Sequence, residues 1–269
     1  MSALNFFRRG ALALGIVMIA SAASAQQTAK DGAFEPYSGQ PGKDVVWVPT
    51  PEVTVNKMLD MAKVTPQDFV VDLGSGDGRT VIAAAKRGAR AMGIEYNPDM
   101  VKLAQGKVKE AGVGDRATIV QGDIFESDFS KATVITLFLL PDLNVKLRPT
   151  ILKMRPGTRV VSNSFRMGEW EPEETVSVED CQSWCTALLW IVPAQVNGTW
   201  KTAGGNLTFK QTFQMVSGTL GSQPITDGKL TGEQITFKVG NATYTGRVSG
   251  NSITGTITGG PGGSWTATR

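Results

Sequence analysis

The residues with the clearest capacity for chemistry are the acids and glycines of DLGSGDG, residues 72–78. A glycine-rich turn between a strand and a helix lets a ligand approach the backbone closely. The spacing is neither the G-x-G-x-x-G of dinucleotide folds nor the G-K-S/T of phosphate-binding loops. Asp72 and Asp77 would repel a polyphosphate, because charges of like sign disfavour each other at short range. This turn therefore predicts a site for a ligand with a cationic amino-acid portion.

Two further acids stand at the ends of the next predicted strands. Glu95 ends the second strand, where a carboxylate can accept hydrogen bonds from both hydroxyls of a ribose. Asp123 ends the third, and Ile124 and Phe125 follow it, which suits an adenine held by one polar group beside apolar side chains. Glu95 alone would more often be a solvated cap. Its assignment depends on the glycine turn before it, and together the acids predict a nucleoside pocket.

The composition excludes several kinds of site. The chain contains no histidine, which excludes Ser-His-Asp and Cys-His catalysis and histidine as a metal ligand or general base. The formal net charge is +3, and Arg8 and Arg9 contribute two of these charges from the leader. The remaining chain is near neutral, so no nucleic-acid partner is predicted.

Cys181 and Cys185 are the two cysteines of the chain. They make a poor zinc site without other ligands, and no metal is predicted. An oxidising compartment favours one disulfide between them. On an extended strand their Cα atoms would lie about 13 Å apart, whereas a bridge needs less than about 7 Å. DCQSWC must therefore turn if the bridge forms, and buried thiols are the alternative.

Alternating strand and helix patterns must position these residues. Strand patterns occur at 69–73, 90–96, 116–123, 132–141 and 158–165. A first helical pattern begins after Thr50, the predicted N-cap, and further helical patterns occur at 79–89, 97–111 and 143–155. The alternation predicts an α/β fold with a doubly wound, mostly parallel sheet and helices on both faces. Segments 174–179 and 186–192 would add two antiparallel strands, for seven in total.

The composition changes after Pro193. Residues 194–269 are rich in Gly, Thr, Ser and Asn, with alternating apolar positions between turn signals. They predict a small C-terminal antiparallel β-barrel or meander, which strands near 198–200 and 263–269 could close. The predicted organisation is a signal peptide at 1–25, a flexible arm at 26–44, the α/β domain at 45–193 and the β domain at 194–269.

The first 25 residues are typical of a secretory signal. Arg8 and Arg9 precede an apolar segment, and Ala23-Ser24-Ala25 is a cleavage site of the A-x-A type. The paired arginines also resemble a twin-arginine signal, without its preferred neighbours. We expect export to the periplasm of a Gram-negative bacterium, and an uncleaved signal that anchors the chain is the alternative. The apolar segment is shorter than the roughly 20 residues of a membrane span, so the mature chain is expected to have none.

The motifs described above carry a family resemblance. DLGSGDG, Glu95 and the QGDIF turn resemble, in order, the motifs of class I S-adenosylmethionine-dependent methyltransferases over roughly residues 45–195. WVPTPEVTV, DLGSGDGRT, TLFLLPDLN and RPGTRVVSNSF are similar to the narrower group of the ATP-synthase c-subunit lysine methyltransferases and their bacterial relatives. The resemblance implies a methyltransferase-type, Rossmann-like sheet and S-adenosyl-L-methionine as the cofactor.

The resemblance also implies roles for particular residues. Those assigned to the cofactor are Asp72, Gly74, Ser75, Gly76, Asp77 and Gly78 in the glycine turn, Glu95 at the ribose, and Tyr96, Asp123 and Ile124 at the adenine. Trp47 to Pro51 would lie over the cofactor. Leu139, Leu140 and Pro141 would lie beside the methyl group, with LFLLP as a merely buried strand end being the alternative. Asp142, or alternatively a backbone carbonyl, is assigned as a hydrogen-bond acceptor for a lysine amine, a hypothesis from residue types.

Three functions remain open at this point. The first is methyl transfer to a protein lysine, a small amine, a hydroxyl or a lipid headgroup. The second is an exported, non-catalytic protein that binds a nucleoside or another small molecule, with the β domain contacting a partner. In the third, the β domain is the functional unit and binds an apolar ligand or the envelope.

Overall fold

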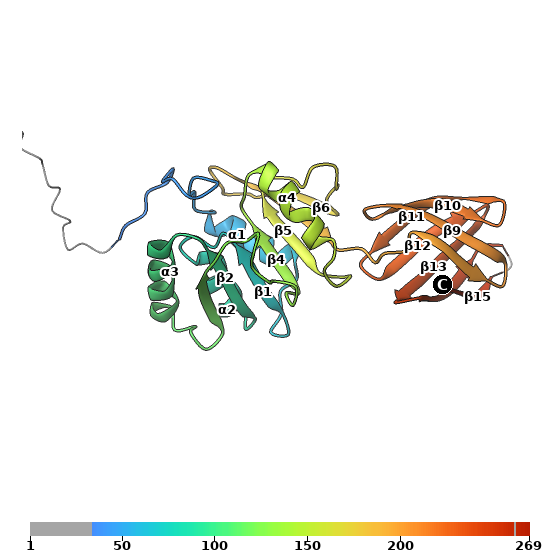
Figure 1. The fold of residues 1–269 in the computed structure, drawn as a ribbon, viewed down its shortest axis with the longest axis horizontal. Coiled ribbons are helices and arrows are strands. Elements are labelled where there is room, and N and C mark those ends of the chain that lie inside the picture. The colour runs from blue at the N-terminus through green and yellow to red at the C-terminus, as the bar shows by residue number, and fades with distance from the viewer. Residues whose placement is uncertain (1–33, 261) are drawn as a thin grey trace, which may run out of the picture. The chain divides into compact units, whose positions relative to one another are not determined.

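The computed structural model of the chain describes residues 34–260 and 262–269 (Figure 1). The predicted signal peptide and residues 26–33 of the predicted arm lie outside the described residues. Two β assemblies follow each other along the chain, a seven-stranded sheet and a closed eight-stranded barrel. Among the described residues, no helix has the length and apolarity that crossing a bilayer requires.

The seven-stranded sheet has the predicted doubly wound, mostly parallel fold. Its order is β3-β2-β1-β4-β5-β7-β6, with the first five strands parallel and β7 antiparallel to both neighbours. The elements are α1 (Glu52–Met61), β1 (Phe69–Leu73), α2 (Arg79–Lys86), β2 (Arg90–Glu95), α3 (Pro98–Glu110), β3 (Ala117–Gln121), β4 (Val134–Leu137), α4 (Pro141–Ile151), β5 (Arg159–Asn163), β6 (Glu174–Ser177) and β7 (Thr186–Ile191).

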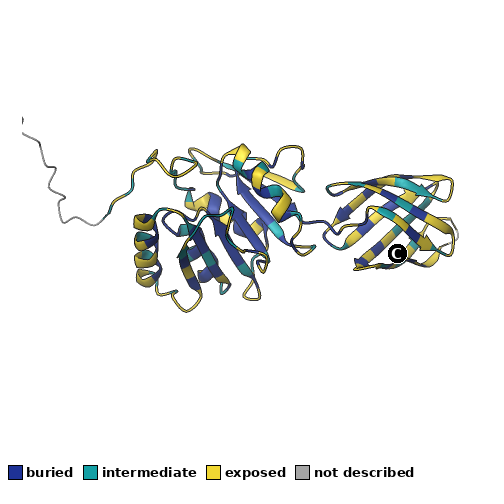
Figure 2. Ribbon diagram, in the orientation of Figure 1, coloured by how far each residue is buried: buried dark blue, intermediate teal, exposed yellow. Residues whose placement is uncertain are grey.

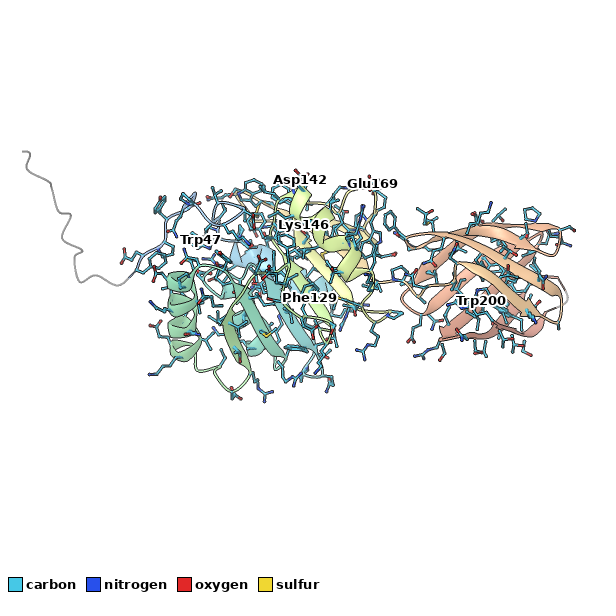
Figure 3. All side chains as sticks on the ribbon, in the orientation of Figure 1. Trp47, Phe129, Asp142, Lys146, Glu169 and Trp200 are labelled. Atoms are coloured by element: carbon cyan, nitrogen blue, oxygen red, sulfur yellow. A yellow bond between two sulfur atoms is a disulfide. The ribbon has the colours of Figure 1, made fainter. Side chains whose placement is uncertain are left out.

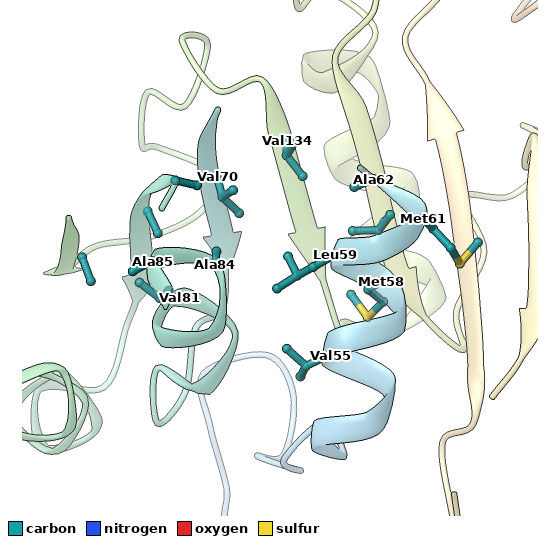
Figure 4. Packing of buried hydrophobic residues seen from close by; sticks show 14 of the residues in the cluster. Val55, Met58, Leu59, Met61, Ala62, Val70, Val81, Ala84, Ala85 and Val134 are labelled. Carbon is teal, nitrogen blue, oxygen red and sulfur yellow. The ribbon is translucent and has the colours of Figure 1, made fainter. Parts of the chain in front are cut away.

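The central strands are buried because helices cover both faces of the sheet. Every residue of β4 is buried, as Figure 2 shows for the middle of the sheet. Successive side chains of a strand point to opposite faces, so Val70 packs with α1, α2 and α3, whereas Val71 packs with α4. Figure 4 shows the first of these clusters, where Leu59 of α1 and Val81 of α2 meet the sheet.

Several predicted element boundaries are wrong. Pro51 rather than Thr50 is the N-cap of α1, and no side chain caps that helix. The predicted strand at 132–141 ends at Leu137, and α4 begins at Pro141 instead of 143. Proline is favoured at the first helical position because its fixed φ suits a helix and its missing N–H is not needed there. The LFLLP segment is therefore a strand end, a short connection and a helix start.

The C-terminal strands form the predicted barrel. They are β8 (Gly198–Thr202), β9 (Gly205–Thr212), β10 (Met215–Leu220), β11 (Gln223–Thr231), β12 (Gln234–Val239), β13 (Ala242–Ser249), β14 (Ser252–Thr258) and β15 (Gly263–Thr268). The first and last of these strands pair and close the ring. Aromatic side chains occupy its interior, where Phe237 contacts Phe209, Tyr244 and Trp265 with ring centroids 4.9–5.5 Å apart.

Candidate functional site

The carboxyl ends of β1, β2 and β4 meet at one cavity, which the segment 40–50 also lines. Strand order reverses between β1 and β4, and open α/β sheets bind their ligands at such a switch point. The segment folds back on itself, because the backbone N–H of Trp47 donates to Gln40 at 2.8 Å and that of Gly39 donates to Trp47 at 2.8 Å. Trp47, labelled in Figure 3, thereby reaches the cavity.

The glycine turn leaves space in the cavity because its glycines have no side chains. Gly74, Gly76 and Gly78 all have positive φ, between +51° and +80°, which L side chains rarely adopt. A Cβ at Gly76 would lie 2.5 Å from Nε1 of Trp47, and one at Gly74 would lie 3.1 Å from Cδ2 of Leu139. Gly78 has a different position from the predicted one. It is the N-cap of α2, faces Ala104 of α3 and is not among the residues that line the cavity.

Asp72 is a buried acid whose neighbours do not neutralise it. Burial, together with the negative charges of Glu95 and Asp77, raises the pKa of Asp72 to about 7, although hydrogen bonds lower it in part. One of these is the 2.6 Å bond that the Thr136 hydroxyl donates to Oδ1. A cationic ligand group in the cavity would supply the missing positive partner. A ligand whose amino-acid portion carries an ammonium group requires such a carboxylate without a cationic partner, so the site fits the predicted ligand.

Asp77 lies in the same turn but in the opposite electrostatic situation. Arg79 donates to it through Nε at 3.0 Å and Nη2 at 2.8 Å, and Lys107 donates at 2.7 Å. Burial alone would raise the pKa of Asp77, but these bonds and charges outweigh it and lower the pKa to about 2. The residue types of the turn predict a free negative charge at Asp77. The structure shows that two basic residues of the chain already pair with it.

Glu95 lines the cavity at the end of β2, where the ribose role requires it. Its Oε2 accepts the backbone N–H of Gly76 and its Oε1 accepts that of Asn97, each at 2.9 Å. These bonds fix the carboxylate and connect β2 to the glycine turn. Each oxygen retains a second lone pair for a ligand hydroxyl.

The predicted adenine residues also line the cavity. Asp123 forms an ion pair with Lys43, and its Oδ1 accepts the N–H of Phe125 at 2.9 Å. These two bonds hold the pKa of Asp123 below its ordinary value. The ammonium of Lys43 also lies 4.7 Å from the ring centroid of Tyr96. Lys43 was not predicted, because its partner lies 80 residues away in the sequence.

The residues predicted beside the methyl group do not all reach the cavity. Leu139 lines it, but Leu140, Pro141 and Asp142 are exposed in the connection and the first turn of α4 (Figure 3, which labels Asp142). The reason is the early start of α4, which turns these three side chains into helix-start positions. Phe138 and Leu143 line the cavity instead. Phe138 is an aromatic residue within LFLLP, and that could have been noted from the sequence.

DCQSWC makes the turn on which the predicted disulfide depended. Cys181 and Cys185 are bonded, with their Cα atoms 5.6 Å apart. The loop lies between β6 and β7, beside α1, because Oγ1 of the buried Thr54 donates to the carbonyl of Trp184 at 3.3 Å.

The chain is similar in sequence to known methyltransferases. The family model of the ANTKMT methyltransferase domain matches residues 72–174. A protein-lysine N-methyltransferase of Saccharolobus islandicus (strain REY15A) is 45% identical over 151 residues, which are 55% of this chain and 94% of that protein. The ATP-synthase c-subunit lysine N-methyltransferase of Mus musculus is 36% identical over 107 residues, 39% of this chain and 43% of that protein. The chain therefore spans under half of this mouse relative.

One solved structure is also similar. It is an RNA methyltransferase from Salinibacter ruber in complex with S-adenosyl-L-homocysteine, with 50% sequence identity and a TM-score of 0.53. The match covers 55% of this chain and 96% of that chain.

Proposed function

The chain belongs to the class I S-adenosylmethionine-dependent methyltransferases, in the group of the lysine N-methyltransferases, and from this premise we propose that it methylates a lysine side chain of a protein. The observation that carries the proposal is the 45% identity that extends over 94% of a protein-lysine N-methyltransferase. The cavity supports it, because a buried acid, Asp72, and an apolar wall of Phe138, Leu139 and Leu143 both line it.

We assign the cofactor contacts as follows. Asp72 would pair with the ammonium group, the glycine turn would lie along the methionine portion, Glu95 would accept the ribose hydroxyls, and Asp123 with Ile124 would hold the adenine. Bound S-adenosylmethionine supplies a methyl group already activated by its sulfonium. The protein's own tasks are therefore to orient the acceptor and to exclude water.

The acceptor amine must be neutral when it attacks. A lysine amine has a reference pKa of about 10.4, so at neutral pH it arrives as an ammonium. Desolvation disfavours the charged form, and the apolar wall of the cavity would lower the pKa of an amine placed against it. Asp142 is exposed in the first turn of α4. Proton loss to solvent at the cavity mouth is therefore the route that we favour over proton transfer to Asp142.

Calorimetry and mass spectrometry test this proposal together. We expect S-adenosylmethionine and S-adenosylhomocysteine to bind the purified protein, and cells with the gene to contain proteins whose lysines are heavier by one methylene than in cells without it. Binding without any methylated lysine would favour the non-catalytic alternative. Methyl label in total RNA, the acceptor class named for the Salinibacter ruber protein, would instead replace lysine with a nucleotide acceptor.

We further propose that the protein acts after export, in the periplasm. The leader and the Cys181–Cys185 disulfide support this, since disulfides persist in oxidising compartments. Fractionation and mass spectrometry of the N-terminus test it. We expect a periplasmic protein that begins at Gln26. A chain with the leader intact in the membrane fraction would establish the anchored alternative.

A further inference from the structure

Three aromatic side chains connect the cofactor cavity with the protein surface. Phe138 lines the cavity, and its ring centroid lies 6.0 Å from that of Phe165 and 5.5 Å from that of Trp184. The centroids of Phe165 and Trp184 are also 5.5 Å apart. Phe138 and Phe165 are partly buried, whereas Trp184 is 41% exposed. We call this set, Phe138, Phe165 and Trp184, the aromatic wall.

Three hydrogen bonds hold the backbone of Phe165 in place. Its carbonyl accepts the hydroxyl of Ser162 at 2.8 Å and the side-chain amide of Asn144 at 3.2 Å. Its N–H donates to Asn163 at 2.7 Å, across Ser164, whose φ is +60°. Non-glycine residues with positive φ persist only where the surroundings enforce them, and they cluster at ligand sites.

The backbone of Trp184 is also held in place, although its ring is exposed. It lies inside the five-residue loop closed by Cys181–Cys185, at a φ of +58°. Its carbonyl accepts the hydroxyl of Thr54 at 3.3 Å, and the loop is closed at its base by the bond from the N–H of Val178 to Cys185 at 2.7 Å. A cross-linked loop with a strained backbone thus presents a large apolar ring to solvent.

Such an arrangement is not a packing requirement of the sheet. Trp170 and Trp190, which belong to the core, are 1% and 0% exposed. A lysine side chain matches the wall, because its methylene chain packs on aromatic faces and its ammonium is attracted to the ring of a tryptophan. The wall also starts at the cavity, so a lysine that follows it inward arrives at the cofactor.

Resting on the proposed lysine methylation, we propose that the aromatic wall is the binding surface for the acceptor lysine and that the Cys181–Cys185 disulfide positions Trp184 within it. Trp184 and Phe165 contact the acceptor. The two cysteines are positioning residues, which act only through the ring that they hold. Acceptor affinity therefore depends on the oxidation state of the loop, while cofactor affinity does not.

Labelled poly-L-lysine serves as the probe, at about 0.15 M ionic strength so that long-range attraction is screened. Its binding is measured by fluorescence anisotropy with S-adenosylhomocysteine present, and its methylation by radiolabel transfer. We expect Trp184→Ala to raise both Kd and KM for poly-L-lysine by about tenfold, as loss of a cation–π contact and its packing implies. The Kd and KM of Trp184→Phe should lie between those of the wild type and of Trp184→Ala. The affinity of both variants for S-adenosylhomocysteine should equal that of the wild type.

Met215→Ala is the matched control, because it removes a similarly exposed apolar side chain, 54% accessible, from the barrel. It should bind and methylate poly-L-lysine like the wild type. Wild-type affinity in Trp184→Ala would overturn the aromatic wall, and so would a wild-type protein that does not bind the probe. Binding that depends on Trp184, without methylation of any lysine, would instead overturn the proposed function.

The role of the disulfide is tested by the C181S/C185S variant, with its thermal unfolding measured alongside to establish that it folds. We expect the same rise in Kd as for Trp184→Ala, and no further rise when all three substitutions are combined, since residues that act through one another are not additive. Wild-type affinity in the double serine variant, or an additive loss in the triple one, would overturn the positioning role.

Discussion

Asp72 and Asp77 belong to the same glycine turn, yet they carry protons in different pH ranges. Asp72 has a pKa of about 7 and Asp77 a pKa of about 2. The difference lies in their partners, because Asp72 accepts a hydroxyl from Thr136, whereas Asp77 pairs with the guanidinium of Arg79 and the ammonium of Lys107. Residue types within the turn predict a ligand site, but they do not distinguish the acid that is free to meet a ligand.

The pKa of Asp72 predicts how cofactor binding depends on pH. Below about pH 7 the carboxyl is protonated in the free protein, and a cationic ligand must expel that proton before it pairs with the carboxylate. We therefore expect affinity for S-adenosylmethionine to rise by about tenfold from pH 6 to pH 8, following linkage. Calorimetry at both pH values measures this. Asp72→Asn should bind more weakly and with little dependence on pH, and an unchanged slope in that variant would assign the titration to another group.

The same group has the opposite effect on the stability of the free protein. The folded pKa of about 7 is above the ordinary value of 3.8, so the folded state binds the proton more tightly. The free energy of unfolding should fall as pH rises from about 4 to 7 through this group. In Asp72→Asn that contribution should vanish, and the variant should be more stable than the wild type at pH 8. Denaturant unfolding at pH 5 and pH 8 compares them.

Lys43 offers a second prediction for a single residue. Oδ1 of Asp123 accepts the N–H of Phe125 and Oδ2 pairs with Lys43, so an adenine amino group that donates to Oδ2 would compete with Lys43. Lys43→Met should therefore tighten binding of S-adenosylhomocysteine, by about fivefold or less, because exposed ion pairs are weak. Lys102→Met, which removes the exposed pair with Asp99 on α3, is the control. Weaker binding in Lys43→Met would mean that Lys43 closes over the cofactor instead.

At the scale of elements, the sheet was predictable and its loop ends were not. Central parallel strands are continuous apolar runs, and local turn signals separate them, so their existence and order follow from local pattern. The start of α4 does not, since a proline can end a strand or open a helix. The position of that boundary determines which residues line the acceptor side of the cavity. Phe138 lines it, whereas Leu140, Pro141 and Asp142 are exposed. Local pattern also does not connect Trp184 with the cavity, because only the loop closed by the disulfide places its ring beside Phe138.

The contact between the glycine turn and the segment 40–50 can be tested by Gly76→Ala. The new methyl group would meet the Trp47 ring at 2.5 Å, at a φ of +51°. We expect a loss of about 1–2 kcal/mol in the free energy of unfolding from the left-handed backbone, and weaker cofactor binding as Trp47 is displaced. Adding Trp47→Ala should restore part of the binding but none of the backbone cost. Equal losses in the single and double variants would exclude the steric contact as the cause.

At the scale of the whole molecule, the barrel is closed by residues at its two ends in the sequence. The guanidinium of Arg269 lies 4.5 Å from the ring centroid of Trp200 and donates to the carbonyls of Gln195 and Asn197. Arg269→Ala should therefore lower the free energy of unfolding of the barrel by about 1 kcal/mol. Affinity for S-adenosylhomocysteine should not change, and differential scanning calorimetry with and without that ligand separates the two effects.

The pairing of β8 with β15 affects the order in which the parts of the chain can fold. Every strand of the seven-stranded sheet has been synthesised once Ile191 is made, whereas the barrel cannot close until Thr268 follows. Contacts between residues far apart in sequence form slowly, because the chain between them must first be ordered. The strands β8 to β14 each pair with the next strand along the chain, so until β15 is made the unpaired edges are those of β8 and β14. Newly made chains are thus most vulnerable to aggregation and proteolysis in their C-terminal third, after the catalytic domain has everything it needs to fold.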